Sequence, residues 1–112
     1  MRLLMVTVFA ASALIAVTPA VSSPSNYQQA KKAIYEVFGP YAVQAIRVAG
    51  CETGGTYNLN AQNGQYLGIF QMGDYARSRY GHSSTSYLIQ AVDAYEYFVA
   101  SGRNWSPWSC KP

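Results

Sequence analysis

Apolar residues recur at helical spacing in several parts of the chain, and glycine-rich breaks separate these parts. The spacing predicts helices over about residues 26–38, 40–52 and 87–100, and a shorter one over about 74–80. Asn26 is the expected cap of the first helix. The side chains expected to face the core are Ala30, Ala33, Ile34 and Val37 in the first helix, Ala42, Ala45, Ile46 and Ala49 in the second, and Leu88, Ala91, Val92, Tyr95 and Val99 in the last.

Between the second and third helical segments the chain is rich in asparagine, glutamine and glycine. Residues 56–71 show no helical periodicity, and Asn63-Gly64 is a dipeptide favoured in tight hairpin turns. We therefore expect a small irregular β-hairpin in this part. A length of 112 residues predicts one small domain. Together, the four helices and the hairpin predict a mostly helical (α+β) fold class with a short hairpin patch.

The first twenty residues follow a different pattern. Arg2 precedes an uncharged apolar run over residues 3–17, and the small residue Ala20 follows. This is the three-part pattern of a secretory signal peptide, and the run is shorter than the roughly 18–20 residues that cross a bilayer. We expect a signal peptide over residues 1–20, a mature domain over 21–112, and no membrane association after cleavage. An uncleaved membrane anchor is the alternative.

The chain has two cysteines, Cys51 and Cys110, and the expected export decides which state of their thiols is favoured. Two thiols in an exported chain favour a disulfide. In the entropy model, a closed loop of about sixty residues stabilises the fold by roughly 4 kcal/mol. Two unpaired thiols are the alternative. His82 is the only histidine, so we expect neither a metal site nor a metal cofactor.

The composition narrows the class of partner. The net charge is +3, charged residues make up 12% of the chain, and Lys31-Lys32 is a lone basic pair, which does not make a nucleic-acid-binding stripe. Ten tyrosines, two tryptophans and twelve asparagines and glutamines suit a groove that binds an uncharged, hydroxyl-rich polymer. The alternative is that these aromatic residues pack a small secreted core.

Five carboxylates are candidates for acid–base chemistry. Glu36, Asp93 and Glu96 fall inside predicted helices, where we expect solvated faces. Asp74 opens a helix, where an N-cap role is expected. Glu52 ends a helix, where the negative end of the macrodipole helps it to keep its proton, and two glycines after it leave space for a bulky polymer. A protonated carboxylic acid suits cleavage of a glycosidic bond. An exposed glutamate at a helix end is the alternative.

Four segments carry a family resemblance when they are taken in order. They are CETGG at 51–55, NGQYLGIFQM at 63–72, IQAVDAY at 89–95 and WSPWSC at 105–110. Together they resemble the lysozyme-like superfamily, and most of all the transglycosylase-like catalytic domains of the resuscitation-promoting-factor type, which Gram-positive actinobacteria secrete. The resemblance covers about residues 42–110 and implies a small lysozyme-like domain with one disulfide. The chain departs from the nearest relatives by one extra residue before Gln71, a spacing that resembles soluble lytic transglycosylases.

The resemblance also implies roles for single residues. Glu52 corresponds to the catalytic acid of the family. The expected substrate-binding residues are Gln71, Tyr66, Gly68, Tyr57 and Trp105. Gly68 corresponds to a small residue that lets a sugar approach the backbone. Trp105 or Trp108 is expected either at the cleft or in the core.

The function implied is that of a secreted enzyme of the cell wall that cleaves peptidoglycan glycan strands. One glutamate would break the MurNAc–GlcNAc bond, as in a lytic transglycosylase or a lysozyme-like muramidase, with no cofactor. We expect a monomer, a wall endopeptidase is a candidate partner, and nucleic acid is not expected to bind. The alternatives are a non-catalytic domain of the same fold that binds wall glycan, and a disulfide-stapled domain with no sugar ligand.

Overall fold

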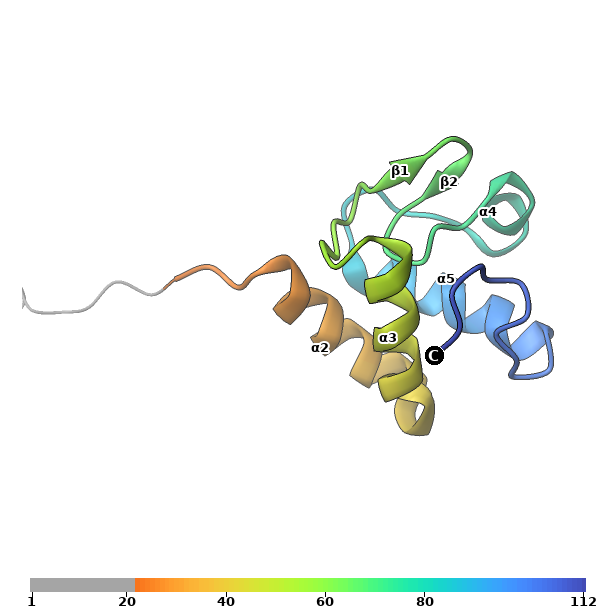
Figure 1. Ribbon diagram of the computed structural model, residues 1–112, viewed down its shortest axis with the longest axis horizontal. Helices are drawn as coiled ribbons and strands as arrows, with labels where there is room; N and C mark the ends of the chain where they lie inside the picture. Colours follow the sequence, from red (N-terminus) through yellow and green to blue (C-terminus); the bar gives the residue numbers. More distant parts are fainter. Residues whose placement is uncertain (1–21) are drawn as a thin grey trace, which may run out of the picture.

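Helices and one hairpin form where the sequence predicts them in the computed structural model of this protein, which describes residues 22–112 (Figure 1). The expected signal peptide, residues 1–20, lies outside the described residues. The helical elements are α2 (Asn26–Phe38), the 3₁₀ helix η2 (Gly39–Tyr41), α3 (Ala42–Glu52), α4 (Asp74–Tyr80) and α5 (Tyr87–Ala100). The strands β1 (Gln62–Asn63) and β2 (Tyr66–Leu67) pair antiparallel, with Gln62 opposite Leu67. The mostly helical fold class with a small hairpin is thus confirmed.

The first helix is capped one residue earlier than predicted. The Ser25 hydroxyl accepts the backbone N–H of Gln28 at 3.1 Å, and the Gln28 side-chain oxygen accepts the N–H of Ser25 at 2.8 Å. This reciprocal pair is a capping box. Asn26 is therefore the first helical residue and not the cap.

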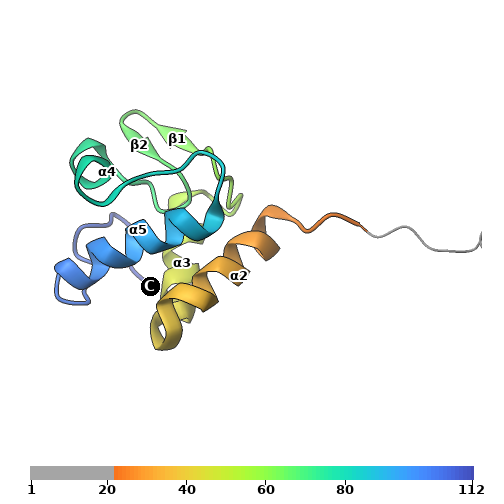
Figure 2. The ribbon, with the colours of Figure 1, turned by 180° about the vertical axis from the view of Figure 1, so that it is seen from behind.

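The core lies where α2, α3 and α5 meet, and the hairpin and α4 form a second layer above it (Figures 1 and 2). The rings of Phe98 and Trp105 lie 4.4 Å apart, centroid to centroid. Phe38 stacks on Trp105 at 5.8 Å with an interplanar angle of 18°. These rings come from α2, α5 and the C-terminal tail, so the core forms only when distant parts of the chain meet.

The buried face of α5 differs from the predicted stripe. Leu88 and Val92 are 45% and 38% exposed, although both were predicted to be buried. The helices α2 and α5 pack against each other, and both bury alanines: Ala30 and Ala33 on α2, Ala91 and Ala94 on α5. The residues that α5 buries are Gln90, Ala91, Asp93, Ala94 and Phe98.

The predicted disulfide is present between Cys51 and Cys110, whose Cα atoms are 6.0 Å apart. It joins the C-terminal tail to the last turn of α3, so the tail returns across the helices after α5 ends (Figure 1). Over residues 22–112, no helix combines the length and the apolar character that crossing a membrane requires.

Asp93 is buried, although a solvated face was predicted for it, whereas Glu36 and Glu96 are exposed as predicted. Within the described residues, Oδ2 of Asp93 has no hydrogen-bond partner. A Cβ added to Gly81 would lie 3.2 Å from each carboxylate oxygen of Asp93. The Asp93 carboxylate therefore packs closely against the backbone at Gly81. Burial raises the pKa of Asp93, and the charge of Glu96 raises this pKa further. The ionised form of Asp93 therefore opposes folding.

We expect Asp93→Asn to stabilise the fold at pH 7 by about 1 kcal/mol, since it removes a buried charge. The folded-state pKa of Asp93 lies above that of the unfolded chain, so the unfolded chain releases this proton first as pH rises. The parent protein therefore loses stability as pH rises from the unfolded pKa, about 4, through the folded pKa, and the variant does not. Urea unfolding at neutral and acidic pH measures the difference. An advantage of the variant that persists below about pH 3 would contradict this account.

Candidate functional site

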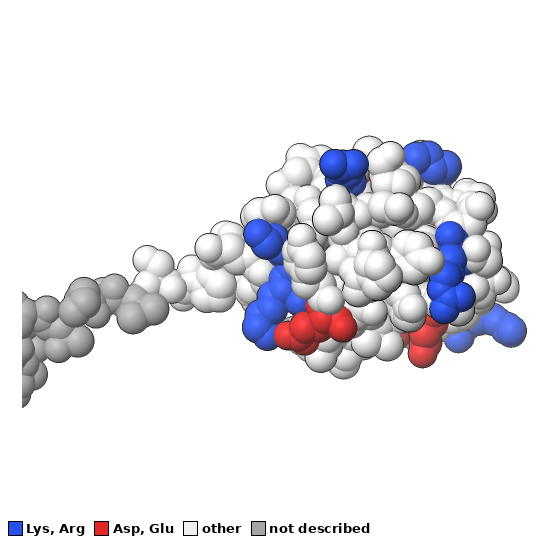
Figure 3. Space-filling view, turned by 90° about the horizontal axis from the view of Figure 1, so that it is seen from below, with Lys and Arg blue, Asp and Glu red and all other residues white. Residues whose placement is uncertain are grey.

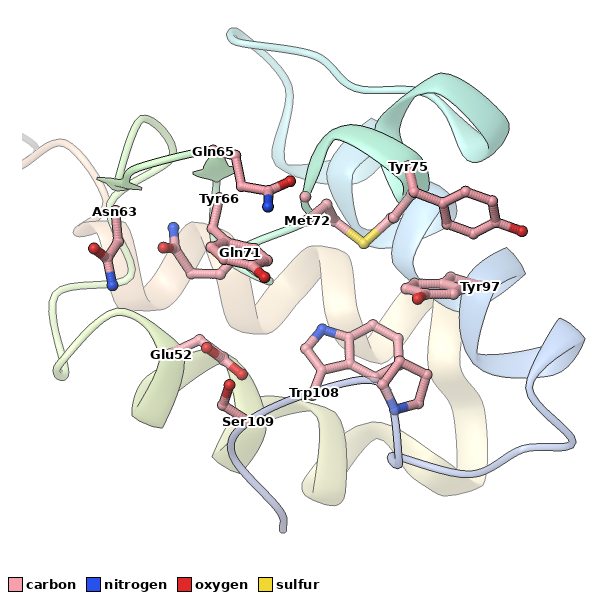
Figure 4. Close-up of a pocket in the computed structure, with 13 residues that line it drawn as sticks. Glu52, Asn63, Gln65, Tyr66, Gln71, Met72, Tyr75, Tyr97, Trp108 and Ser109 are labelled. Atoms are coloured by element: carbon pink, nitrogen blue, oxygen red, sulfur yellow. The ribbon is translucent and has the colours of Figure 1, made fainter.

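A cleft of about 370 Å³ lies between the hairpin, α4, α5 and the C-terminal tail (Figure 4). Its lining combines one carboxylate with neutral amides and aromatic rings. The groups that carry this character are Glu52, Asn63, Gln65, Gln71, Tyr66, Tyr75, Tyr97 and Trp108. Segments distant in sequence therefore supply the cleft, and they meet only in the folded domain.

Glu52 lies in the cleft as the last residue of α3, and its side chain is half-buried. Its Oε2 accepts the backbone N–H of Cys110 at 3.1 Å. This donor belongs to the residue that the disulfide joins to Cys51, the neighbour of Glu52. Within residues 22–112, Oε1 accepts no hydrogen bond. The tail thus holds one carboxyl oxygen and leaves the other for a ligand.

Gln71 and Tyr66 lie on the hairpin side of the cleft that Glu52 also lines (Figure 4). Gln71 has a φ of +46°, an uncommon conformation for a residue other than glycine. Its side-chain amide donates to the carbonyls of Gly68 at 2.9 Å and Ala61 at 3.1 Å. Both donors are then used within the hairpin, so the side-chain oxygen is the polar group that Gln71 offers to a ligand.

Gly68 is not among the residues that line the cleft, in contrast to the role implied by the resemblance. It is buried with a φ of +83°, and an added Cβ would lie 2.5 Å from Oε1 of Gln90. That oxygen accepts the N–H of Ile69 at 2.8 Å. The Gln90 amide donates to the carbonyls of Leu59 at 2.8 Å and Ser83 at 2.7 Å. Gly68 therefore makes room for a buried glutamine and not for a sugar.

Trp105 and Tyr57 are also placed away from the cleft. Trp105 is 6% exposed, and its indole N–H donates to the side-chain oxygen of Gln44 at 2.8 Å. The Tyr57 hydroxyl donates to the carbonyl of Ile46 at 2.9 Å, which fixes the ring against α3. Trp108 lines the cleft in place of Trp105. Both tail tryptophans belong to the core, where their ring centroids lie 5.1 Å apart, and Trp108 also borders the cleft.

Asp74 does not supply a second carboxylate to the cleft. It is the first residue of α4, and Gly73 occupies the cap position that was predicted for Asp74. Its Oδ1 lies 2.7 Å from Nη2 of Arg77, and its side chain is 76% exposed. The Arg77 guanidinium also donates to the carbonyls of Gln65 and Met72, which joins α4 to the hairpin. Asp74 is part of a surface ion pair.

Two aromatic residues of the cleft, Tyr75 and Tyr97, were missed by the sequence analysis. The Tyr97 ring lies 5.1 Å from Tyr80 and 5.1 Å from Trp108, and 6.5 Å from Tyr75, between centroids. Burial raises the pKa of the Tyr97 hydroxyl, and the neighbouring hydroxyls of Tyr75, Tyr80 and Tyr66 raise it further. This phenol is therefore neutral at physiological pH. Tyr97 falls outside the predicted apolar stripe, so helical spacing alone gives no signal for it.

Across residues 22–112, no group of three or more histidine, cysteine, aspartate or glutamate side chains could hold a metal ion. No family model matches the chain, and no match was found to a curated protein or to a solved structure. The lysozyme-like assignment stays a prediction that rests on the sequence motifs.

We expect Gly68→Ala to destabilise the protein by about 3 kcal/mol, because the added methyl group combines a strained φ with a collision against Gln90. Gly64→Ala is the matched control. Gly64 has a φ of +61°, and an added Cβ meets no atom within 4 Å, so we expect a loss of about 1 kcal/mol. Chemical unfolding of both variants measures the difference. Equal losses would show that the Gln90 contact is unimportant.

Proposed function

We propose that this protein cleaves peptidoglycan glycan strands at the MurNAc–GlcNAc bond, with Glu52 as the single acid and base. One observation carries the proposal: Glu52 is the sole carboxylate in a cleft whose other polar groups are neutral. All five carboxylates of the chain lie within the described residues, and the other four are not among those lining the cleft. The motif resemblance independently favours the same residue.

A cleft with one carboxylate favours a substrate that supplies its own nucleophile. Retaining and inverting glycosidases ordinarily need two carboxyl groups at a set separation across the bond. In the proposed reaction, Glu52 gives its proton to the bridging oxygen as the bond to the anomeric carbon of the muramoyl sugar breaks. The 6-hydroxyl of that sugar then forms a bond to the same carbon and returns its proton to Glu52. The product is a 1,6-anhydro sugar, and no water is consumed.

The contacts of Glu52 assign different tasks to its two oxygens. Oε2 accepts the N–H of Cys110, so Oε1 is the oxygen that can carry the transferred proton. Positive charge develops on the sugar ring as the bond breaks. The C-terminal end of α3, where Glu52 lies, presents the negative end of the helix dipole to this charge. The geometry thus supports both proton transfer and stabilisation of the transition state.

The lining of the cleft agrees with an uncharged sugar as the ligand, because Glu52 is its one charged side chain. Figure 3 shows lysine and arginine side chains at several places around one face, with uncharged residues between them. Lys32 pairs with Glu36 at 2.6 Å, and this exposed pair offsets the charge of Lys32. The disulfide supports the proposal of export, because such bonds persist in oxidising compartments.

We expect Glu52→Gln to lower the rate of cell-wall lysis by about 100-fold or more, since it removes the proton donor. Binding to insoluble peptidoglycan should be unchanged, because the shape of the side chain is kept. Turbidity loss measures lysis, and a pull-down measures binding. Glu36→Gln, which alters an exposed glutamate on α2, is the matched control and should lyse at the parental rate.

The products distinguish the outcomes of this experiment. Anhydro ends in the mass spectrum support the proposed reaction, and ends that have gained water indicate a muramidase. Parental lysis by Glu52→Gln would remove Glu52 from its role. A parent protein that binds wall glycan but never cleaves it would be the non-catalytic binding domain.

A further inference from the structure

The Asn63-Gly64 dipeptide at the tip of the hairpin has a chemical property that the proposed function does not use. Asn63 is the last residue of β1, and Gly64 follows it in the turn to β2. In such a dipeptide the backbone nitrogen of the glycine is a neighbour of the side-chain amide carbon of the asparagine. Glycine has no β-carbon to hinder their approach. The two groups can therefore react with each other without a catalyst.

The surroundings of the dipeptide leave this reaction unhindered. Both residues are exposed, and within residues 22–112 neither the Asn63 side chain nor the N–H of Gly64 makes a hydrogen bond. A Cβ added to Gly64 would meet no atom within 4 Å, so the turn is open on that side. Each strand of the hairpin has two residues, and so short a ladder resists local movement weakly.

The other four asparagines of the chain, which also lie within the described residues, lack this combination. Each of them precedes a residue whose side chain crowds the backbone nitrogen; they are Asn26, Asn58, Asn60 and Asn104. The side-chain oxygen of Asn58 also accepts the N–H of Asn60 at 2.9 Å. That of Asn104 accepts the N–H of Ser106 at 2.7 Å. Asn63 is therefore the asparagine expected to react first.

The position of Asn63 makes the reaction matter to the site. Asn63 lines the cleft, and Figure 4 shows it reaching from the hairpin into the end of the cleft that Glu52 occupies. Glu52 is the one carboxylate of the lining. Conversion of the Asn63 amide to an acid would supply a second carboxylate, from the opposite wall.

We propose that Asn63 is a site of spontaneous deamidation, which adds a second carboxylate to the cleft. The backbone nitrogen of Gly64 loses its proton to a base in the solvent and attacks Cγ of Asn63. The bond between Cγ and Nδ2 breaks, and the nitrogen takes up a proton and leaves as ammonia. Water then opens the cyclic imide to aspartate or to isoaspartate. One amide and one water thus give one carboxyl group and one ammonia, and nothing is oxidised or reduced.

The consequence for catalysis rests on the proposed function, whereas the modification itself does not. Glycosidases that hydrolyse their substrate ordinarily have two carboxyl groups facing the scissile bond, one of which can activate water. Deamidation gives the cleft such a pair. The deamidated protein is therefore expected to form more product ends that have gained water and fewer anhydro ends.

Peptide mapping by mass spectrometry tests the modification in the folded protein, sampled over time at mildly alkaline pH. We expect the Asn63 amide to be lost at least about tenfold faster than the amide of any other asparagine. The product peptide should separate into aspartate and isoaspartate forms of equal mass, which identify the cyclic imide. Loss in the urea-unfolded chain should be less than about tenfold faster than in the folded protein, because the short hairpin hinders the reaction little.

Asn63→Gln is the matched control, because it keeps the amide but its longer side chain closes the ring poorly. Residue 63 should keep its amide in this variant. Even loss over all five asparagines, a folded protein protected beyond the stated limit, or aspartate without isoaspartate would each overturn the proposed site.

Product analysis on wall glycan tests the consequence for catalysis. Asn63→Asp, and the parent protein after alkaline incubation, should both shift the products from anhydro ends toward ends that have gained water. Asn63→Gln should give the same products before and after that incubation. An unchanged product ratio in Asn63→Asp, or a fresh parent that forms no anhydro ends, overturns this consequence. If none of these proteins cleaves glycan, the proposed function fails, and the peptide map still decides the modification.

Discussion

A single buried amide in α5 connects the helical layer to the loops above it. Gln90 accepts the N–H of Ile69 and donates to the carbonyls of Leu59 and Ser83, which lie in separate segments. Backbone groups buried without such partners would each cost free energy, so one side chain satisfies three of them at once. These three hydrogen bonds fix the position of the hairpin relative to α5. The position of Gln71 on the hairpin side of the cleft depends on them.

The opposite side of the cleft depends on a covalent bond. The disulfide brings the tail against the end of α3, and the N–H of Cys110 then orients Glu52. In the entropy model, closing a loop of this length contributes roughly 4 kcal/mol, a large share for a domain of this size. The residue proposed to carry the chemistry and the bond that stabilises the fold are therefore neighbours. Loss of the bond would affect both stability and the geometry of the acid.

Local patterns predict much of the fold, and tertiary packing decides the rest. Helical spacing and the Asn-Gly turn give the elements and their approximate bounds, because both depend on neighbouring residues. Spacing does not say which side of α5 meets α2, and so Leu88 and Val92 were assigned to the wrong face. The motifs placed Glu52 in the cleft. They did not separate Trp105 from its neighbour in the tail or reveal Tyr75, because those positions depend on how distant segments meet.

The tail carries both tryptophans of the chain; both are buried in the core, and Trp108 also borders the cleft. Trp105 is enclosed by Phe38 and Phe98, and its indole is bound to Gln44, so its emission reports the integrity of the interior. Trp108 borders the cleft, so its emission would change if a ligand filled the cleft. Because the two indole rings lie 5.1 Å apart between centroids, replacing one of them also changes the surroundings of the other. The protein thus contains two intrinsic fluorophores in one aromatic cluster, and one of them also borders the cleft.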